Sequence, residues 1–252
     1  MHINEISDSI RSDAQQEDQL LLGDGQLDHV VDGELVRLAG QGDAQAFTAI
    51  MRKYNRLMFR SVRGVVHDDA EAQDVVQDAY LRAFGAMSQF RGEASLGTWL
   101  VRIAIHSALD AQRKRGRHVR LDDMDDQERQ ALEDRMAIQS EMAAQPDVLA
   151  ERSQLAILLQ RSVDSLPPIY RSVFVLRAVE EMSVQDTAAC LQVSEDVVKT
   201  RYLRARSMLR DALGAQLEPH IPGVYAFAGA RCEAVVRHVL AQLQAQGRLA
   251  AA

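Results

Sequence analysis

Apolar residues recur every three or four positions over much of this chain, which is the spacing of one buried face of an α-helix. Within residues 33–117 the pattern comprises Leu35, Leu38 and Ala39, then Phe47, Ile50, Met51 and Tyr54, then Val75, Val76, Ala79 and Tyr80. Runs of β-branched and aromatic residues, which favour strands, are missing, and only 5% of the residues are aromatic. The spacing therefore predicts an all-α fold.

Acidic residues are concentrated in two segments of the chain. Residues 1–34 carry nine Asp or Glu against one Arg, and residues 121–151 carry ten against two. The rest of the chain is therefore net positive, although the whole chain has a formal charge of −7. We expect two small basic helical domains joined by a flexible acidic linker, the pattern of polyanion-binding domains with solvated connectors. The expected parts are a disordered acidic tail (1–32), a first domain (33–117), the linker (118–147), a second domain (148–213) and a C-terminal extension (214–252).

The stretch SVQDTAACLQVSEDVVKTRYLRARSMLR, residues 183–210, has the pattern of a helix-turn-helix. Ser183 and Ser194 can each cap a helix with the hydroxyl group, and Gln192 and Val193 form a tight turn between the two helices. In the second helix Val198, Tyr202, Ala205 and Leu209 make an apolar stripe, and Lys199, Thr200, Leu203 and Arg204 lie on the opposite side. Such a helix can present side chains to base edges in the major groove. The alternative is an ordinary helical hairpin with a solvated basic face.

The first domain has a different kind of basic segment, residues 88–120, in which Phe90 and Trp99 alternate with arginine and lysine. Aromatic rings stack on unpaired bases and neighbouring cations hold the backbone, so this mixture suits separated strands better than duplex. The alternative is that both rings belong to the core. Upstream, a predicted helix over residues 68–84 turns Asp74, Gln77 and Asp78 outward. This acidic face is a poor DNA surface, and it either docks a basic protein partner or only confers solubility.

Three segments together carry a family resemblance: DAEAQDVVQDAYLRAF, FRGEASLGTWLVRIAIHSAL and LPPIYRSVFVLRAVEEMSVQDTAACLQVSEDVVKTRYLRARSML. In this order and spacing they resemble the two domains of extracytoplasmic-function (ECF) sigma factors of the bacterial sigma-70 family, over residues 35–117 and 151–213. The resemblance implies a sigma2-like domain that binds core RNA polymerase and melts the minus-ten element. It also implies a sigma4-like domain that recognises the minus-thirty-five element.

The resemblance also implies partners and site residues. The partners would be the polymerase β′ clamp and β flap, promoter DNA and an anti-sigma factor, with no cofactor, metal or small-molecule substrate. The polymerase-binding residues would be Asp74, Gln77, Asp78 and Leu81. The residues that bind and melt the minus-ten element would be Phe90, Arg91, Trp99, Arg102, His106 and Arg113. The residues that bind the minus-thirty-five element would be Lys199, Thr200, Arg201, Leu203, Arg204 and Arg206, with Arg201 and Arg206 nearer phosphates or intramolecular partners.

One position departs from the family pattern. Similar proteins commonly carry Asn where this chain has His106, so the amide that could pair with a base edge is replaced by a ring that offers one hydrogen bond.

Two other classes of protein compete with a sigma factor. A stand-alone helix-turn-helix regulator of transcription would leave the aromatic and basic mixture of the first domain unexplained. An enzyme is excluded by the lack of an HExxH pair, a GxSxG elbow or a phosphate-binding GK[ST] loop. No segment approaches the roughly 20 apolar residues of a membrane span, and no signal peptide is recognisable, so we expect a cytoplasmic protein. Cys190 and Cys232 lack metal-site or disulfide spacing and are expected to be small buried residues.

The C-terminal extension has a helical pattern of its own. Phe227, Val235, Val239 and Leu243 fall at near-helical spacing, with Cys232 and Val236 beside them, which predicts an amphipathic helix. We expect this helix to pack on the second domain, and the alternative is a separate regulatory contact.

Overall fold

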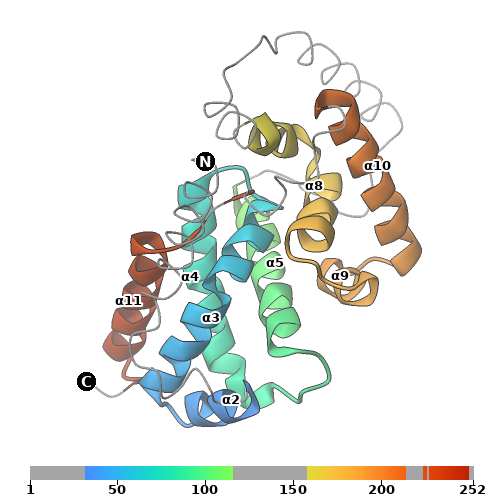
Figure 1. Cartoon of the computed structure of the whole chain (residues 1–252). Helices are drawn as coiled ribbons and strands as arrows, with labels where there is room; N and C mark the ends of the chain where they lie inside the picture. Colours follow the sequence, from blue (N-terminus) through green and yellow to red (C-terminus); the bar gives the residue numbers. More distant parts are fainter. Residues whose placement is uncertain (1–31, 116–157, 214–223, 226, 250–252) are drawn as a thin grey trace, which may run out of the picture.

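The computed structural model of the chain describes residues 32–115, 158–213, 224–225 and 227–249, and these residues form helices joined by turns, with no strand among them (Figure 1). The all-α prediction is therefore confirmed. The predicted acidic linker lies outside the described residues, as does the predicted acidic tail except for Asp32, which begins the first described helix. Within the described ranges, no helix has both the length and the apolar character that crossing a lipid bilayer demands.

The first unit, residues 32–115, is a bundle with one internal core. Its elements are α2 (Asp32–Gly40), α3 (Ala44–Arg63), α4 (Asp69–Ala86), the 3-10 turn η1 (Met87–Gln89) and α5 (Leu96–Lys114). The side chains of Asp43, Asp68 and Ser95 cap α3, α4 and α5 by accepting hydrogen bonds from backbone N–H groups of the first turn. Apolar residues at helical spacing close the core, and Phe47 and Tyr80 are fully buried there.

The second unit, residues 158–213, contains the predicted helix-turn-helix. It comprises a helical segment over 158–165, α8 (Pro168–Phe174), the π-helix η2 (Val175–Val179), α9 (Val184–Leu191) and α10 (Glu195–Leu213). Ser183 caps α9, and Gln192 ends it in the left-handed conformation at φ 57°. Ser194 then accepts a hydrogen bond from Val197 N at 3.3 Å at the start of α10. Both predicted serine caps and the turn between the two helices are confirmed.

The two units pack directly on each other, α5 against α9 and the end of α3 against α8 and η2, so that their buried side chains form one continuous core (Figure 1). Gly64, at the end of α3, permits this close approach. A Cβ atom there would lie 3.2 Å from Cα of Ser172 on α8. Only a glycine fits at that separation without displacing the backbone of α8.

The C-terminal helix α11 (Ala230–Ala245) packs on α3 and α4 of the first unit, on the side away from α9 and α10 (Figure 1). Its predicted stripe of Val235, Val239 and Leu243 is buried there, so the amphipathic helix is confirmed. The prediction that it packs on the second domain is wrong. The physical reason lies in the first unit, where the Phe59 ring stacks on Phe227 with centroids 4.1 Å apart and so accepts the extension.

Candidate nucleic-acid interface

The outward face of α10 carries four of the predicted DNA-contacting residues: Lys199, Thr200, Leu203 and Arg204 are all exposed. The opposite side is anchored, because Val198, Ala205 and Leu209 are fully buried against α8 and α9. Leu203 is 67% exposed, and it is the only large hydrophobic side chain that is exposed among the described residues. The helix therefore presents an apolar side chain within a basic surface.

The other two predicted cations of α10 lie elsewhere. Arg201 is only 9% exposed, because it falls on the same side of the helix as buried Val198 and Ala205. Arg206 is half-buried beside the Tyr202 ring, whose centroid is 6.0 Å from its guanidinium carbon. The spacing of Arg201 at three residues from Val198 and four from Ala205 was the available signal that this arginine would be drawn inward.

A second candidate surface is a face of α5. Trp99, Arg102, His106 and Arg113 follow one another at spacings of three, four and seven, so they share one side of this helix. Phe90 precedes α5, and its ring meets that of Trp99 edge to face with centroids 5.5 Å apart. Both rings are partly buried, and they contact the core without being enclosed by it. The predicted aromatic and basic cluster is thus assembled in one place.

Two of the predicted arginines lie at the ends of this cluster. Arg91 is exposed in the turn before α5, and Arg113 is exposed near the end of α5, where it pairs with Asp110.

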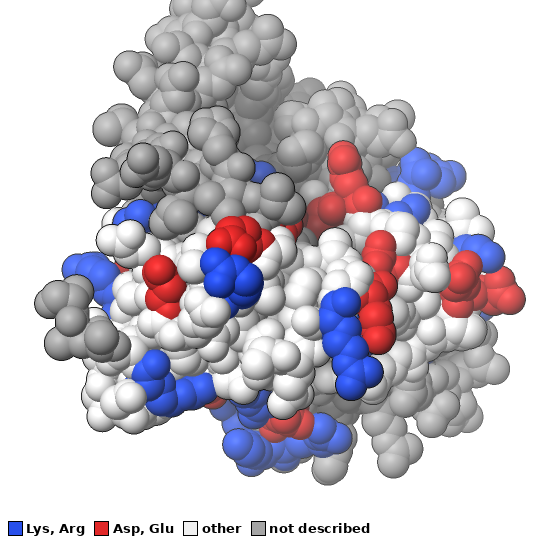
Figure 2. Space-filling model, turned by 90° about the horizontal axis from the view of Figure 1, so that it is seen from below, with Lys and Arg blue, Asp and Glu red and all other residues white. Residues whose placement is uncertain are grey.

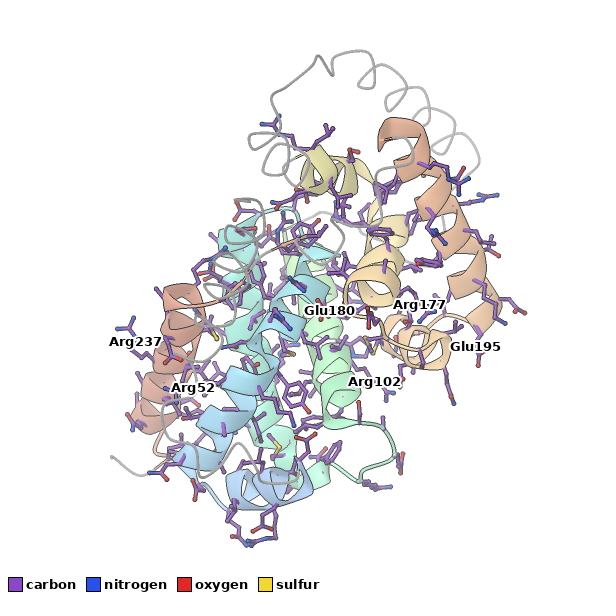
Figure 3. All side chains as sticks on the ribbon, viewed as in Figure 1. Arg52, Arg102, Arg177, Glu180, Glu195 and Arg237 are labelled. Carbon is purple, nitrogen blue, oxygen red and sulfur yellow. The ribbon has the colours of Figure 1, made fainter. Side chains whose placement is uncertain are left out.

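Part of the α5 face is covered by α9 of the second unit. The Thr98 hydroxyl donates to Asp186 Oδ1 at 3.2 Å, and the Cys190 thiol lies 3.5 Å from the carbonyl oxygen of Thr98. Arg102 lies between α5 and α9 (Figure 3). In the described part of the chain Nε of Arg102 and Nε2 of His106 are buried and have no hydrogen-bond partner. These two groups retain donor or acceptor capacity for a ligand.

The predicted polymerase-facing residues also share one surface, on α4. Asp74 and Asp78 are exposed, and Gln77 and Leu81 beside them are half-buried. The C-terminal segment lies along the neighbouring stripe of the same helix. There Arg231 bonds to Asp69 Oδ2 at 2.9 Å, and the guanidinium carbon of Arg248 lies 5.1 Å from the centroid of the Phe84 ring.

A buried arginine that the sequence reasoning missed joins the two units. Arg171 of α8 has no exposed surface, and its guanidinium donates to the carbonyl oxygens of Gly64 at 3.1 Å and Val65 at 2.9 Å in the first unit. It also donates to the carbonyl oxygen of Asp164 at 3.0 Å in its own unit. Burial lowers the pKa of Arg171 from its usual value. The signal was a lone arginine within the apolar run IYRSVFVL.

Other surfaces are poor candidates for a site. At the end of the molecule near α2, acidic and basic side chains lie close together and form no patch of one sign (Figure 2). Ion pairs account for part of this mixture, including Lys53 Nζ with Asp32 Oδ1 at 2.6 Å. Within the described ranges, no group of three His, Cys, Asp or Glu side chains could hold a metal ion.

Both units match known protein families. Residues 50–118 match the family Sigma-70 region 2, and residues 156–209 match the family Sigma-70, region 4. The chain is 31% identical over 182 residues to the RNA polymerase sigma-H factor of Pseudomonas aeruginosa, covering 72% of this chain and 93% of that protein. It is also 31% identical over 183 residues to the ECF RNA polymerase sigma factor SigM of Mycobacterium tuberculosis, covering 73% and 85%.

A solved structure shares the fold. This is CnrH in complex with the cytosolic domain of CnrY, which superposes with a TM-score of 0.50 at 24% identity and covers 73% of this chain and 98% of that one. The two matched regions follow the order of the two predicted domains, and the alignments with the sequence relatives cover most of the chain. The chain therefore belongs to the ECF sigma factors of the sigma-70 family, and it is a sigma factor of transcription initiation.

Proposed function

We propose that this sigma factor uses three separate surfaces, one for each step of promoter engagement. The outward face of α10 recognises the minus-thirty-five element in the major groove. The α5 face with Phe90 captures the melted strand of the minus-ten element. The acidic face of α4 docks on the β′ clamp of core RNA polymerase, while the second unit meets the β flap. The protein performs no catalysis itself and takes no cofactor.

The observation that carries this proposal is the exposed face of α10. An isolated leucine that is 67% exposed gains nothing from water, but in the major groove it can contact a thymine methyl group. Lys199 and Arg204 lie on the same exposed face, where cations can reach phosphates or guanine. A solvated hairpin does not require an apolar side chain on the same exposed face as Lys199 and Arg204.

The α5 face supports the second step. Single strands bind by stacking on aromatic rings and by contacts of cations with the backbone. Trp99 and Phe90 lie edge to face beside Arg102 and His106, whose buried Nε and Nε2 atoms lack partners in the described residues. An extruded base or a sugar-phosphate group can satisfy those atoms once the face is uncovered.

Protein partners follow from the same surfaces. Asp74 and Asp78 project from one side of α4 and offer negative charge to a basic helix pair, as the β′ clamp would provide. The structure that shares the fold contains CnrH with the cytosolic domain of CnrY, so we also propose an anti-sigma factor as a partner.

The decisive experiment is transcription in vitro with purified protein, sigma-free core polymerase and the promoter region upstream of the protein's own gene. Specific transcripts that require the protein are expected. A matched Leu203→Ala variant should lose transcripts from this promoter and keep the same affinity for core polymerase. Binding to duplex DNA without binding to core polymerase would contradict the proposal and favour a stand-alone helix-turn-helix regulator.

A further inference from the structure

Three parts of the chain meet at the end of α3, namely the first unit, the second unit and the C-terminal segment (residues 224–225 and 227–249). Arg63 of α3 bonds to Asp164 Oδ1 of the second unit at 3.1 Å, and Arg60 bonds to Glu180 Oε1 at 3.2 Å. Both Arg63 and Arg60 also contact Tyr225. The C-terminal segment therefore touches the same side chains that join the units.

Tyr225 makes the contacts that connect all three parts. Its hydroxyl donates to Asp164 Oδ1 at 2.7 Å, and the guanidinium carbon of Arg63 lies 4.3 Å from the centroid of its ring. Its carbonyl oxygen accepts from Arg60 Nε at 3.2 Å. The residue is 2% exposed, so these contacts are shielded from water. Hydrogen bonds to charged groups are the stronger ones in proteins, and shielding strengthens them further.

The backbone of Tyr225 supports the same interpretation. Its φ angle is 55°, in the left-handed region that bulky residues rarely adopt. Such a conformation costs free energy and persists only when the surroundings determine it. Here the surroundings are side chains of both units, so the strained turn depends on the units being together.

The described residues from 227 onward are anchored on the first unit. Phe227 stacks on Phe59, Asn55 Nδ2 donates to the Cys232 sulfur at 2.9 Å, and Arg52 Nε bonds to Glu233 Oε1 at 3.0 Å (Figure 3 shows Arg52 beside α11). Hence α11 holds one end of the segment on the first unit, while Tyr225 reaches the second.

We propose that this C-terminal segment acts as an intramolecular clasp that holds the two units closed, with Tyr225 as its contact to the second unit. While the clasp is fastened, α9 stays over the α5 face at Thr98 and Arg102. Because α9 then covers part of the α5 face, the α5 face cannot receive single-stranded DNA. Only this last step rests on the proposed function.

The chain contains its own reporter for each half of the clasp. Cys190 is fully buried at the contact of α9 with α5, and burial raises the pKa of its thiol to about 12. Cys232 is 7% exposed at the contact of α11 with α3. A thiol reacts with maleimide as the thiolate and only where the reagent reaches it, so alkylation of each cysteine depends on the opening of its own contact.

The test is the rate of N-ethylmaleimide labelling of the full chain under native conditions, resolved for each cysteine by mass spectrometry. Tyr225→Phe, which removes only the hydroxyl bond to Asp164, should raise the rate at Cys190 about tenfold and leave that at Cys232 unchanged. Asp164→Ala, which also removes the bond from Arg63, should raise it at least as much. The double variant should add little to Asp164→Ala, because the Tyr225 hydroxyl then has no carboxylate left to bond.

Tyr54→Phe is the matched control, since it removes a 2.7 Å bond from a tyrosine hydroxyl to Asp32 within the first unit. It should leave Cys190 at the wild-type rate. Unchanged Cys190 labelling in Tyr225→Phe, an equal rise in Tyr54→Phe, or a rise at Cys232 alone would each overturn the clasp. Because the assay uses free protein, it gives its answer whether or not the protein supports transcription, so the clasp and the proposed function can fail separately.

Discussion

At the scale of single residues, Arg171 makes hydrogen bonds that join the two units. It supplies hydrogen bonds to the carbonyl oxygens of Gly64 and Val65 in one unit and of Asp164 in the other. This buried cation is tolerated because backbone oxygens replace its water. Removal of the donor leaves these buried oxygens without partners.

We therefore predict that Arg171→Met lowers the free energy of unfolding by about 3 kcal/mol, since several buried carbonyl groups lose their donor at once. Arg171→Lys, which keeps the charge with fewer and less well placed donors, should fall between Arg171→Met and the wild type. Urea denaturation monitored by circular dichroism measures both variants. A loss in Arg171→Met below about 1 kcal/mol would show that water replaces the guanidinium.

On α10, substitutions of Arg204 and Arg206 distinguish sequence-specific recognition of the promoter from general attraction to DNA. Arg204→Ala should weaken binding to the cognate upstream element by about 1–3 kcal/mol and relax sequence preference, whereas Arg206→Ala should weaken all promoters alike. Binding of holoenzyme to matched and mismatched promoters measures the difference. Equal losses on every promoter for Arg204→Ala would count against its contact with a base.

The exposure of single side chains could be predicted where it depends on the residue pattern of one helix. The outward position of Lys199 and Leu203 is set by the apolar stripe on the other side of α10. The role of Arg171 could not be predicted, because its partners in the first unit, the carbonyl oxygens of Gly64 and Val65 and the ring of His67, lie more than a hundred positions away along the chain. The buried atoms of Arg102 and His106 that lack partners in the described part of the chain were equally hidden, since the burial of single atoms depends on how the helices pack.

At the scale of elements, α4 carries a prediction of its own. The double variant Asp74→Ala, Asp78→Ala should weaken binding to core polymerase at least about tenfold, because it removes the exposed negative charge that we propose docks on the clamp. Its melting temperature should not change, since both side chains are exposed. Fluorescence anisotropy with core polymerase measures the affinity.

Glu93→Ala serves as its control, because this glutamate is exposed in the turn before α5, away from α4. If Glu93→Ala weakens core binding as much as the double variant does, net charge and not the face of α4 is responsible.

The elements themselves were predictable because their signals are local. Ser183, the turn at Gln192 and the proline at the start of α8 each fix a helix boundary through neighbouring atoms. The docking of α11 was not predictable in the same way. Its stripe of Val235, Val239 and Leu243 fits any apolar groove, and the partner Phe59 shows its availability only once α3 is packed.

At the scale of the whole molecule, the continuous core makes the two units one cooperative structure. We predict that urea unfolds both in a single transition. The chain has one tryptophan, Trp99 in the first unit, so its fluorescence reports that unit while circular dichroism reports all helices. The two midpoints should coincide in the wild type. A fluorescence midpoint clearly apart from that of circular dichroism would show that the units unfold independently.

The buried guanidinium of Arg171 also orders events during synthesis. Domains made first can fold while the ribosome is still translating later parts of the chain. The carbonyl groups of Gly64 and Val65 leave the ribosome long before Arg171, so until then water must be their partner. Tyr225 emerges later still. The α5 face of the nascent first unit is therefore uncovered when that unit leaves the ribosome. The clasp can hold the second unit over this face only after the C-terminal segment has been translated.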